Sequence, residues 1–184
     1  LINHLYFRLS LKGRENIPAN GPFIIAPNHE SFLDAPMVTS GLSWDTIRNT
    51  YFYATEEHFN TAFKRSVAHG SNVILMQKSD LKSSIQYMAQ ALRAGKNLMI
   101  FPEGRRTNTG EMGDFKKTFA ILAKELRVPI VPVRITGAFE ALPRHKSFPR
   151  PSKVTVEYLP AVMPDVTKSY DEIAEQVKKI IAQD

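Results

Sequence analysis

The sequence FIIAPNHESFLD, residues 23–34, joins a short apolar run to a polar turn. We interpret residues 23–26 as a strand, because a short apolar run that ends at a proline is typical of a strand followed by a turn. This strand delivers His29, and Asp34 follows five residues later. We therefore expect the fold and the chemistry of the chain to centre on this stretch.

His29 and Asp34 are the residue types needed to take a proton from an alcohol. Imidazole has an unperturbed pKa near neutrality, and a neighbouring carboxylate can orient it as a general base. On one regular helix, positions five apart differ by about 140° and do not share a face. If His29 instead ends a strand and Asp34 lies in the first turns of the next helix, the carboxylate can reach back to the ring.

Each residue of this turn also has a purely structural interpretation. A His followed by an Asp is common, and Asp34 can simply complement the positive end of a helix. We interpret Ser31 as the N-cap of a helix that continues to about residue 42. A nucleophilic serine would need an adjacent base, and no Gly-x-Ser-x-Gly elbow is present. The spacing alone leaves both catalysis and helix stabilisation open for Asp34.

A second apolar run, residues 97–101, also ends in a polar turn, with the sequence PEGRR at residues 102–106. Apolar residues in 81–92 recur at helical spacing before it. A strand, helix and strand in succession predict parallel strands with a right-handed crossover. Functional turns gather at the carboxyl ends of parallel strands, so we expect the His29 turn and the Glu103 turn to meet in one crevice.

The remaining pattern predicts one α/β domain over residues 1–184, with a mixed, largely parallel sheet flanked by helices. Ser169-x-x-Glu172 is a capping box for the last helix. Pro132 lies in an expected strand at residues 128–135 and lacks an N–H group, which favours an edge strand or a bulge. Further helices are expected at residues 56–67, 115–126 and 169–181.

The composition is that of an ordinary globular domain, with 184 residues, 43% hydrophobic and 23% charged. The absence of Cys excludes disulfides, thiolate catalysis and Cys-ligated metals. The net charge of +6 suits an anionic membrane surface or phosphate-bearing ligands. No apolar run approaches the roughly 18–20 residues of a membrane span. Residue 1 is Leu, which leaves open an upstream anchor or a fused domain of a longer chain.

Three motifs, in order over about residues 20–140, resemble those of the glycerolipid acyltransferase family, which includes the 1-acylglycerol-3-phosphate acyltransferases. The family's NHxSxxD motif is matched by Asn28, His29, Ser31 and Asp34. Its FPEGTR motif is matched by Phe101, Pro102, Glu103, Gly104 and Arg106, with Arg105 where the family usually has Thr. Its VPIVPV-like strand is matched by residues 128–133. The three motifs together are far more specific than any one alone.

The resemblance implies transfer of a fatty acyl group from an acyl thioester, acyl-CoA or acyl-carrier protein, to the hydroxyl of a lysophospholipid or related glycerolipid. It implies that His29 is the general base and that Asp34 holds its tautomer. Backbone N–H groups near the His29 turn are the expected oxyanion donors. This chemistry belongs to phospholipid biosynthesis or remodelling and requires no metal or redox cofactor. We expect a cytoplasmic protein that is peripherally associated with the inner face of a membrane.

The resemblance also implies a site for the phosphate of the acceptor, in which the planar guanidinium of Arg106 binds the phosphate. Lys78 stands near the place of a family Arg that contacts the same phosphate. A lysine lacks Arg's bidentate fork, so the acceptor can differ from that of the phosphatidate-forming enzymes. Lys116 is expected to face the crevice and aid phosphate or thioester-carrier binding. The expected substrate-binding residues are Asn28, Glu103, Gly104, Arg106, Lys78 and Lys116.

Two other classes of function remain open. A non-catalytic lipid-binding or partner-binding module would bind lysolipid and leave the thioester intact. A thioesterase or lipid hydrolase would use His29 to activate water and would release free fatty acid. The basic residues elsewhere are dispersed and no nucleic-acid-binding motif accompanies them, so no nucleic acid partner is expected. A basic loop is either a headgroup, CoA or carrier contact or a solvated loop, and it contains Arg144, His145, Lys146 and Arg150.

Overall fold

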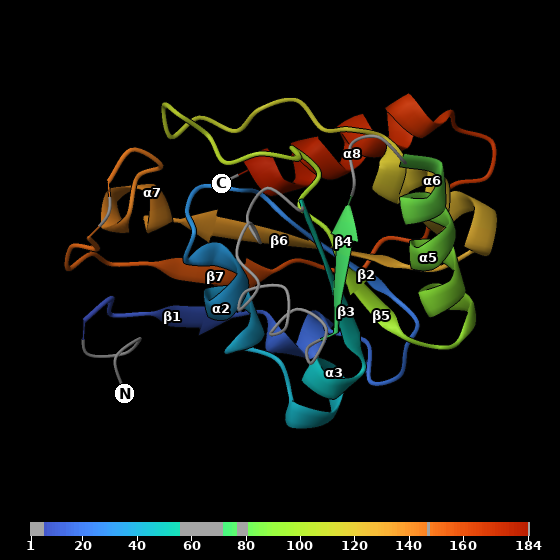
Figure 1. Cartoon of the computed structure of the whole chain (residues 1–184), viewed down its shortest axis with the longest axis horizontal. Coiled ribbons are helices and arrows are strands. Elements are labelled where there is room, and N and C mark those ends of the chain that lie inside the picture. The colour runs from blue at the N-terminus through green and yellow to red at the C-terminus, as the bar shows by residue number, and fades with distance from the viewer. Residues whose placement is uncertain (1–5, 56–71, 77–80, 147, 184) are drawn as a thin grey trace.

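The computed structural model describes residues 6–55, 72–76, 81–146 and 148–183. It contains a seven-stranded sheet in the order β1-β7-β6-β2-β5-β3-β4, with helices packed on it (Figure 1). Lys78 and the helix expected at residues 56–67 lie outside the described residues. The strands are β1 Ser10–Lys12, β2 Ile24–Pro27, β3 Thr50–Thr55, β4 Val73–Met76, β5 Asn97–Met99, β6 Ile130–Thr136 and β7 Thr155–Tyr158.

Every neighbouring pair of strands is parallel except β6 and β7, which are antiparallel. The expected mixed, largely parallel sheet is therefore confirmed. The central strands β6, β2 and β5 run in the same direction, with Ile24 of β2 opposite Leu98 of β5 and Ile130 of β6. Their carboxyl ends consequently lie at one end of the sheet, where the polar turns of the sequence begin.

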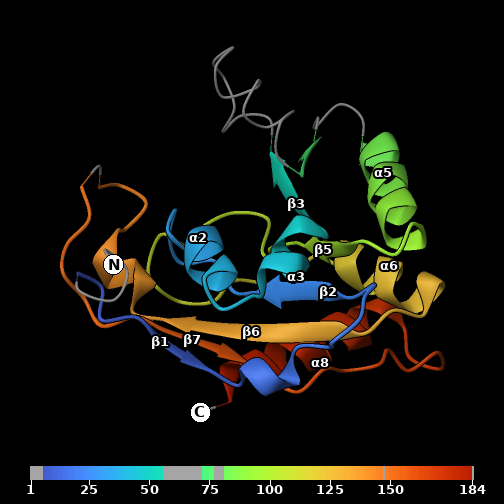
Figure 2. The same cartoon turned by 90° about the horizontal axis from the view of Figure 1, so that it is seen from below.

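Helices cover both faces of this sheet (Figures 1 and 2). They are α2 Asp34–Thr39, α3 Trp44–Arg48, α5 Leu81–Arg93, α6 Thr118–Leu126, α7 Ala138–Ala141 and α8 Tyr170–Ala182, with a 3₁₀ turn at Arg14–Asn16. On one face, α5 packs against α6 and α6 against α8, while α2 and α7 belong to the core on the other face. The capping box predicted at Ser169 and Glu172 starts α8.

Strand β2 is covered on both faces. Its successive side chains point to opposite sides of the sheet, as strand geometry requires. Ile25 packs in the cluster that contains Met37 of α2, whereas Ile24 packs in the cluster that contains Phe119 of α6. All four of these side chains are buried. Burial on both sides explains why the run before the His29 turn is apolar without alternation.

The helix after the His29 turn begins later than expected. α2 starts at Asp34, with Leu33 at its N-cap position, and ends at Thr39. Ser31 is therefore not the N-cap. Its hydroxyl instead donates a hydrogen bond to the carbonyl of Leu142, 2.9 Å away. The three residues before Asp34 stay outside the helix, which lets the carboxylate turn back toward the strand end.

Pro132 does not lie in an edge strand, because β6 is an internal strand between β2 and β7. The paired residues of β6 and β7 stop at Val133 and Tyr158, and the next bridge joins Ile130 to Val162. Between these two paired positions, the segment opposite β6 has one residue more than β6 itself, so the hydrogen-bond ladder is interrupted beside the proline. The missing N–H group therefore falls where the regular ladder is already broken.

Candidate active site

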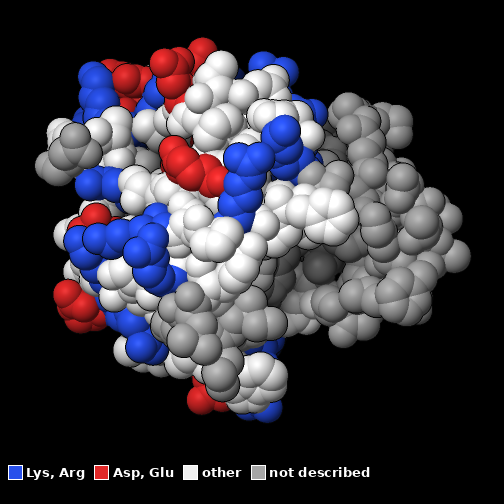
Figure 3. All heavy atoms as spheres, turned by 90° about the vertical axis from the view of Figure 1, so that its left-hand side faces the viewer, with Lys and Arg blue, Asp and Glu red and all other residues white. Residues whose placement is uncertain are grey.

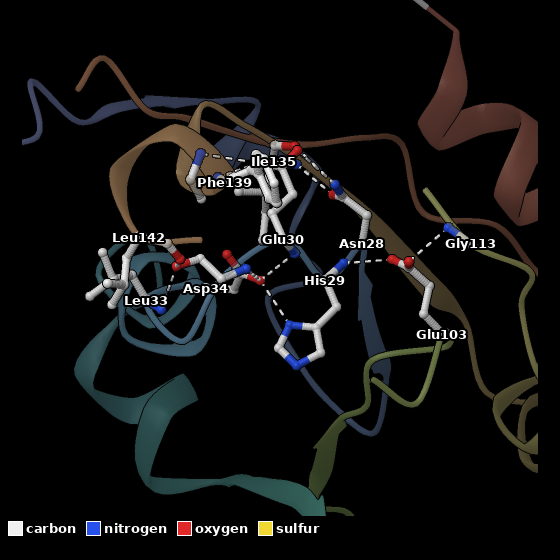
Figure 4. Close-up of polar contacts among 12 residues, drawn as sticks. Asn28, His29, Glu30, Leu33, Asp34, Glu103, Gly113, Ile135, Phe139 and Leu142 are labelled. Atoms are coloured by element: carbon white, nitrogen blue, oxygen red, sulfur yellow. Dashed lines mark hydrogen bonds and ion pairs between the residues drawn. The ribbon is translucent and has the colours of Figure 1, made fainter. Parts of the chain in front are cut away.

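The turns that follow β2, β5 and β6 meet at the carboxyl end of the sheet (Figure 4). His29, in the first turn, is joined to the second turn through both of its backbone groups. Its N–H donates to Oε1 of Glu103 (2.6 Å), and its carbonyl accepts from the N–H of Thr107 (2.9 Å). The third turn joins them because Oε2 of Glu30 accepts the first two N–H groups of α7. The two turns that the topology predicts to converge are in direct contact.

His29 and Asp34 are hydrogen-bonded to each other, with 2.8 Å between Nδ1 and Oδ2. Because a carboxylate only accepts hydrogen bonds, Nδ1 carries the proton and the lone pair of the neutral ring is on Nε2. Nε2 points away from Asp34 (Figure 4), and the side chain of His29 is 18% exposed. The imidazole stacks on the ring of Phe101, with centroids 3.9 Å apart and planes 22° apart. This contact fixes the plane of the ring.

Asp34 is fully buried and accepts several hydrogen bonds on one oxygen. Its Oδ2 accepts from the N–H groups of Glu30 and Ser31, each at 2.7 Å, as well as from His29. Burial raises the pKa of the Asp34 carboxyl, while the hydrogen bonds from His29 and the two backbone groups lower it. The three donors keep this oxygen aimed at the imidazole.

Three of the backbone N–H groups near His29, where oxyanion donors are expected, already have acceptors in the protein. The N–H of His29 is taken by Glu103, and those of Glu30 and Ser31 are taken by Asp34. A backbone N–H that donates to a buried carboxylate is not available to a second acceptor. These three donors of the first turn hold the side chains of Asp34 and Glu103 beside His29.

Asn28, an expected substrate ligand, is hydrogen-bonded inside the protein instead. Its Oδ1 accepts from the N–H of Ile135 (2.7 Å), and its Nδ2 donates to the carbonyl of Ile135 (2.9 Å) and to Oε1 of Glu30 (3.4 Å). The side chain thus continues the hydrogen bonding between β2 and β6 beyond the end of β2. Asn28 is buried, and the structure gives it the role of positioning the residue that follows, His29.

Glu103 and Gly104 lie in the second turn. Glu103 is 7% exposed and joins two loops, since its Oε1 accepts from His29 and its Oε2 from the N–H of Gly113 (2.8 Å). Burial raises the pKa of Glu103, while these two N–H groups lower it. Gly104 has a φ of 69°, and a Cβ at this position would lie 2.7 Å from Nζ of Lys116. Lys116 therefore lies beside the second turn, as expected.

Arg106 lies on the same side of the molecule as His29, because the next residue, Thr107, donates its N–H to the His29 carbonyl. The guanidinium carbon is 5.9 Å from the ring centroid of Phe32, a residue of the first turn that is 66% exposed. Burial lowers the pKa of Arg106, and the positive charge of Arg144 lowers it further. A partly exposed cation thus lies over the first turn, on the side of the molecule that carries His29.

Glu30 is a member of this site that the sequence did not reveal. Its carboxylate accepts from the N–H groups of Ala138 (3.0 Å) and Phe139 (3.1 Å). Burial raises its pKa from 4.5 to about 7, although the hydrogen bonds from these two groups act in the opposite direction. The only local signal is an acidic residue placed directly after His29. Its partners lie more than 100 residues away, so the contact itself has no sequence signature.

A cavity of about 250 Å³ lies between the first two turns, the end of β6 and the end of α8. Its lining includes Glu103, Met112, Ile135 and Ile181. Within the part of the chain that the structure describes, no group of three or more His, Cys, Asp and Glu side chains is arranged to hold a metal ion. In the same part, no helix combines the length and the apolar character of a membrane span.

Comparison with known proteins places the motif turns in a described family. The family model for the acyltransferases matches residues 8–136, a range that includes the His29 turn and the Glu103 turn. Among solved structures, the chain is similar to the 1-acyl-sn-glycerophosphate acyltransferase PlsC from Thermotoga maritima. The TM-score is 0.82 at 25% sequence identity, and the match covers 94% of this chain and 68% of the other.

Curated relatives match a smaller part of their own length. The chloroplastic 1-acyl-sn-glycerol-3-phosphate acyltransferase BAT2 of Brassica napus is 26% identical over 143 residues, which are 75% of this chain and 40% of the relative. The 1-acyl-sn-glycerol-3-phosphate acyltransferase of Limnanthes alba is 36% identical over 111 residues, which are 58% of this chain and 39% of the relative. The chain thus spans about two fifths of these relatives. Because the family model matches well over half of the residues, this chain belongs to the acyltransferase family.

Proposed function

We propose that this chain transfers a fatty acyl group from an acyl thioester to the free hydroxyl of a lysophospholipid or related glycerolipid. The observation that carries the proposal is the buried carboxylate of Asp34 on Nδ1 of His29, with Nε2 facing away from it beside the turn that bears Arg106. The names of the relatives, which act on 1-acylglycerol 3-phosphate, support the same class of reaction.

In the proposed reaction, Nε2 of His29 removes the proton from the acceptor hydroxyl as its oxygen attacks the thioester carbonyl. A C–O bond forms, and the carbonyl oxygen becomes an oxyanion. When this tetrahedral intermediate collapses, the C–S bond breaks and the thiolate leaves with the proton of the imidazolium. Asp34 stabilises the imidazolium in the interval. The step uses no covalent enzyme intermediate and no metal or redox cofactor.

The second turn is the proposed site of the acceptor phosphate. Arg106 offers a planar guanidinium that can bind two phosphate oxygens at once. Lys116, whose Nζ lies against Gly104, supplies a further positive charge at the same turn. Lys78 remains a proposed phosphate contact outside the described residues. The donor is acyl-CoA or an acyl-carrier protein, and a carrier protein or a fused domain would be the macromolecular partner.

The acceptor is a membrane lipid, and we propose that this end of the molecule contacts an anionic bilayer. Phe32 and Phe148 are 66% and 84% exposed. Figure 3 shows Lys and Arg side chains gathered on the face at the α7 end, where the exposed residues Arg144, Lys146 and Arg150 follow that helix. Exposed aromatic rings beside cations favour peripheral binding at a bilayer interface, here the inner, cytoplasmic face of a membrane. Co-sedimentation with phosphatidylglycerol vesicles, but not with neutral phosphatidylcholine vesicles, tests this contact.

Two other functions use the same fold and differ in their products. A non-catalytic lipid-binding module would bind lysolipid and leave the thioester intact. A thioesterase or lipid hydrolase would direct His29 at water and would release free fatty acid. Incubation of the purified protein with acyl-CoA or acyl-carrier protein and a panel of lysolipids, followed by mass spectrometry of all products, distinguishes the three.

The variant that tests the proposed base is His29→Ala, which removes the imidazole and leaves the backbone hydrogen bonds of residue 29. We expect acyl transfer to fall by about 10²–10⁴-fold. Tyr87→Ala on α5 removes an exposed ring outside the site and should transfer at the parental rate. Thermal unfolding of both variants checks that they fold. A His29→Ala protein with a rate near the parent would reject the base assignment.

A further inference from the structure

Arg144 brings a second guanidinium to the loop that carries Arg106. Its Nη1 lies 3.5 Å from Oδ1 of Asn108, two residues beyond Arg106. Thr107, between Arg106 and Asn108, is the residue whose N–H binds the His29 carbonyl. Both arginines therefore belong to or contact one short segment, residues 106–108, which is hydrogen-bonded to His29, the proposed base.

The position of Arg144 is set by contacts with the first turn. The helix before it, α7, is held at its start by Glu30, whose carboxylate accepts the N–H groups of the first two helical residues. The end of that helix is held by Ser31, whose hydroxyl donates to the carbonyl of Leu142. Arg144 follows Leu142 by two residues. The turn that carries the base thus also places Arg144.

Neither guanidinium is neutralised within the part of the chain that the structure describes. No carboxylate of those residues lies within ion-pair distance of Arg106 or Arg144. The positive charge of Arg144 lowers the pKa of Arg106, and the negative charge of Asp34 acts in the opposite direction. Like charges held together in this way favour a bound anion of more than one negative charge.

We propose that Arg106 and Arg144 together form a binding site for a phosphate monoester dianion, and that Arg144 selects acceptors with this headgroup over acceptors with a phosphodiester. This inference rests on the proposed function, in which Arg106 binds the acceptor phosphate. A phosphate monoester has a second pKa near about 6, so it carries close to two charges at neutral pH and offers three terminal oxygens. A phosphodiester carries one charge and offers two. The second guanidinium therefore adds more to the binding of the monoester.

Two substrates of the proposed reaction contain a phosphate monoester, namely a 1-acylglycerol 3-phosphate acceptor and the 3′-phosphate of CoA. We assign the site to the acceptor. The acceptor's phosphate is only a few bonds from the hydroxyl that must reach His29, and the two arginines lie at the segment fastened to His29. The 3′-phosphate of CoA is separated from the thioester by the whole pantetheine arm.

The test compares Arg144→Gln with the parent in equilibrium binding, measured by calorimetry without any acyl donor. The ligands are a short-chain lysophosphatidate and the lysophosphatidylglycerol of the same chain length. We expect Arg144→Gln to bind the monoester about tenfold more weakly and the diester at most about twofold more weakly. Arg144→Lys keeps the charge and should lose less. Arg93→Gln, which removes an exposed cation from the last turn of α5, should match the parent for both ligands.

Equal weakening for both ligands, or none for the monoester, would overturn the proposal. Lowering the pH below about 6 removes the second charge of the monoester and should shrink the parent's preference toward that of Arg144→Gln. Thermal unfolding of each variant checks that it is folded.

Steady-state rates with acyl-CoA and with its dephospho form, which lacks the 3′-phosphate, identify the source of the dianion. The acceptor assignment predicts that Arg144→Gln raises the KM of the acceptor equally with both donors. A raised KM for acyl-CoA alone would overturn it. A parent that prefers the monoester in binding but transfers no acyl group would reject the proposed function and leave the phosphate site standing. A parent that transfers acyl groups with a preference independent of Arg144 would reject the site alone.

Discussion

Two regions of the molecule differ in where their charged groups lie. They are the first turn, residues 27–34, and the loop after α7, residues 143–150. Around the first turn, the carboxylates of Glu30, Asp34 and Glu103 each accept two backbone N–H groups. In the loop, Arg144 and its basic neighbours are exposed to solvent. The buried carboxylates thus hold the site in shape, whereas the exposed cations are accessible to a ligand.

The energetic reason for this division is desolvation. A buried carboxylate without hydrogen bonds is costly, so burying one near the base requires donors, and the backbone supplies them. Backbone donors are held by the fold, whereas a side-chain donor can move. The carboxylates are therefore suited to fixing a geometry. An exposed guanidinium keeps its hydration until an anion displaces it, which suits reversible binding.

The largest expected effect tests the central member of the buried set. Asp34→Asn should lower kcat by about 10²–10⁴-fold and leave the KM of the acceptor nearly unchanged, because a neutral amide does not stabilise the imidazolium that forms when His29 takes the proton. Initial rates with acyl-CoA measure it. Asp45→Asn removes an exposed carboxylate of α3 and should keep the parental rate. Equal rates in the two variants would contradict an orienting role for Asp34.

A smaller effect is expected at Glu103, which acts on the backbone of His29 rather than on its ring. Each carboxylate oxygen of Glu103 accepts from a backbone N–H group. Glu103→Gln replaces one of these oxygens with an NH₂ group, which cannot accept that hydrogen bond. We expect a loss of about 1–3 kcal/mol in the free energy of unfolding and a fall in kcat of about tenfold, since the base is displaced rather than removed. Urea unfolding and initial rates measure the two quantities. Glu111→Gln, at an exposed position of the following loop, is the matched control. A variant with parental stability would show that the bridge to Gly113 does not hold the turn.

A third effect is a pH dependence of stability that arises from Glu30, another member of the buried set. Its pKa is raised by burial from 4.5 to about 7, so the folded protein binds this proton more tightly than the unfolded chain does. The stabilisation is complete below about pH 4.5 and is lost as the pH rises through about 7. We expect the free energy of unfolding of the parent, relative to Glu30→Gln, to fall over this range and then level off.

Urea unfolding at a series of pH values measures this difference, and Glu15→Gln, at an exposed acid of the 3₁₀ turn, should show the parental pH dependence. A difference between parent and Glu30→Gln that stays constant with pH would mean that the hydrogen bonds from α7 outweigh burial. Glu30 would then stay charged, as the exposed arginines of the loop do.

The sequence predicts the parts of this site that depend on local pattern. The unbroken apolar run at residues 23–26 indicates a strand covered on both faces, and the rule for parallel strands brings the His29 and Glu103 turns together. The contact between Asp34 and His29 can also be predicted, since it requires only that a strand end near His29 and a helix begin near Asp34. Each of these inferences uses a few neighbouring residues and general geometry.

The parts that the sequence did not predict depend on partners far along the chain. Asn28 matches a family motif, and its amide binds the backbone of Ile135, 107 residues away, a contact that the motif does not predict. The N–H groups of His29, Glu30 and Ser31 donate to carboxylates whose placement follows from tertiary packing. The missing N–H group of Pro132 predicts an edge strand or a bulge, and the structure has the irregular opposing segment of a bulge and not an edge. The proline alone does not decide between the two, because the decision depends on a segment far along the chain.

The hydrogen bond between Glu103 and the backbone of His29 closes a chain segment of 74 residues. Contacts of that separation form late in folding, after local helices, because they carry the entropy of closing a long loop. A nascent or partly folded chain therefore contains the motif but no aligned imidazole. The proposed acyl transfer becomes possible only once the global structure is complete, so this activity and cooperative folding should be regained in the same kinetic phase.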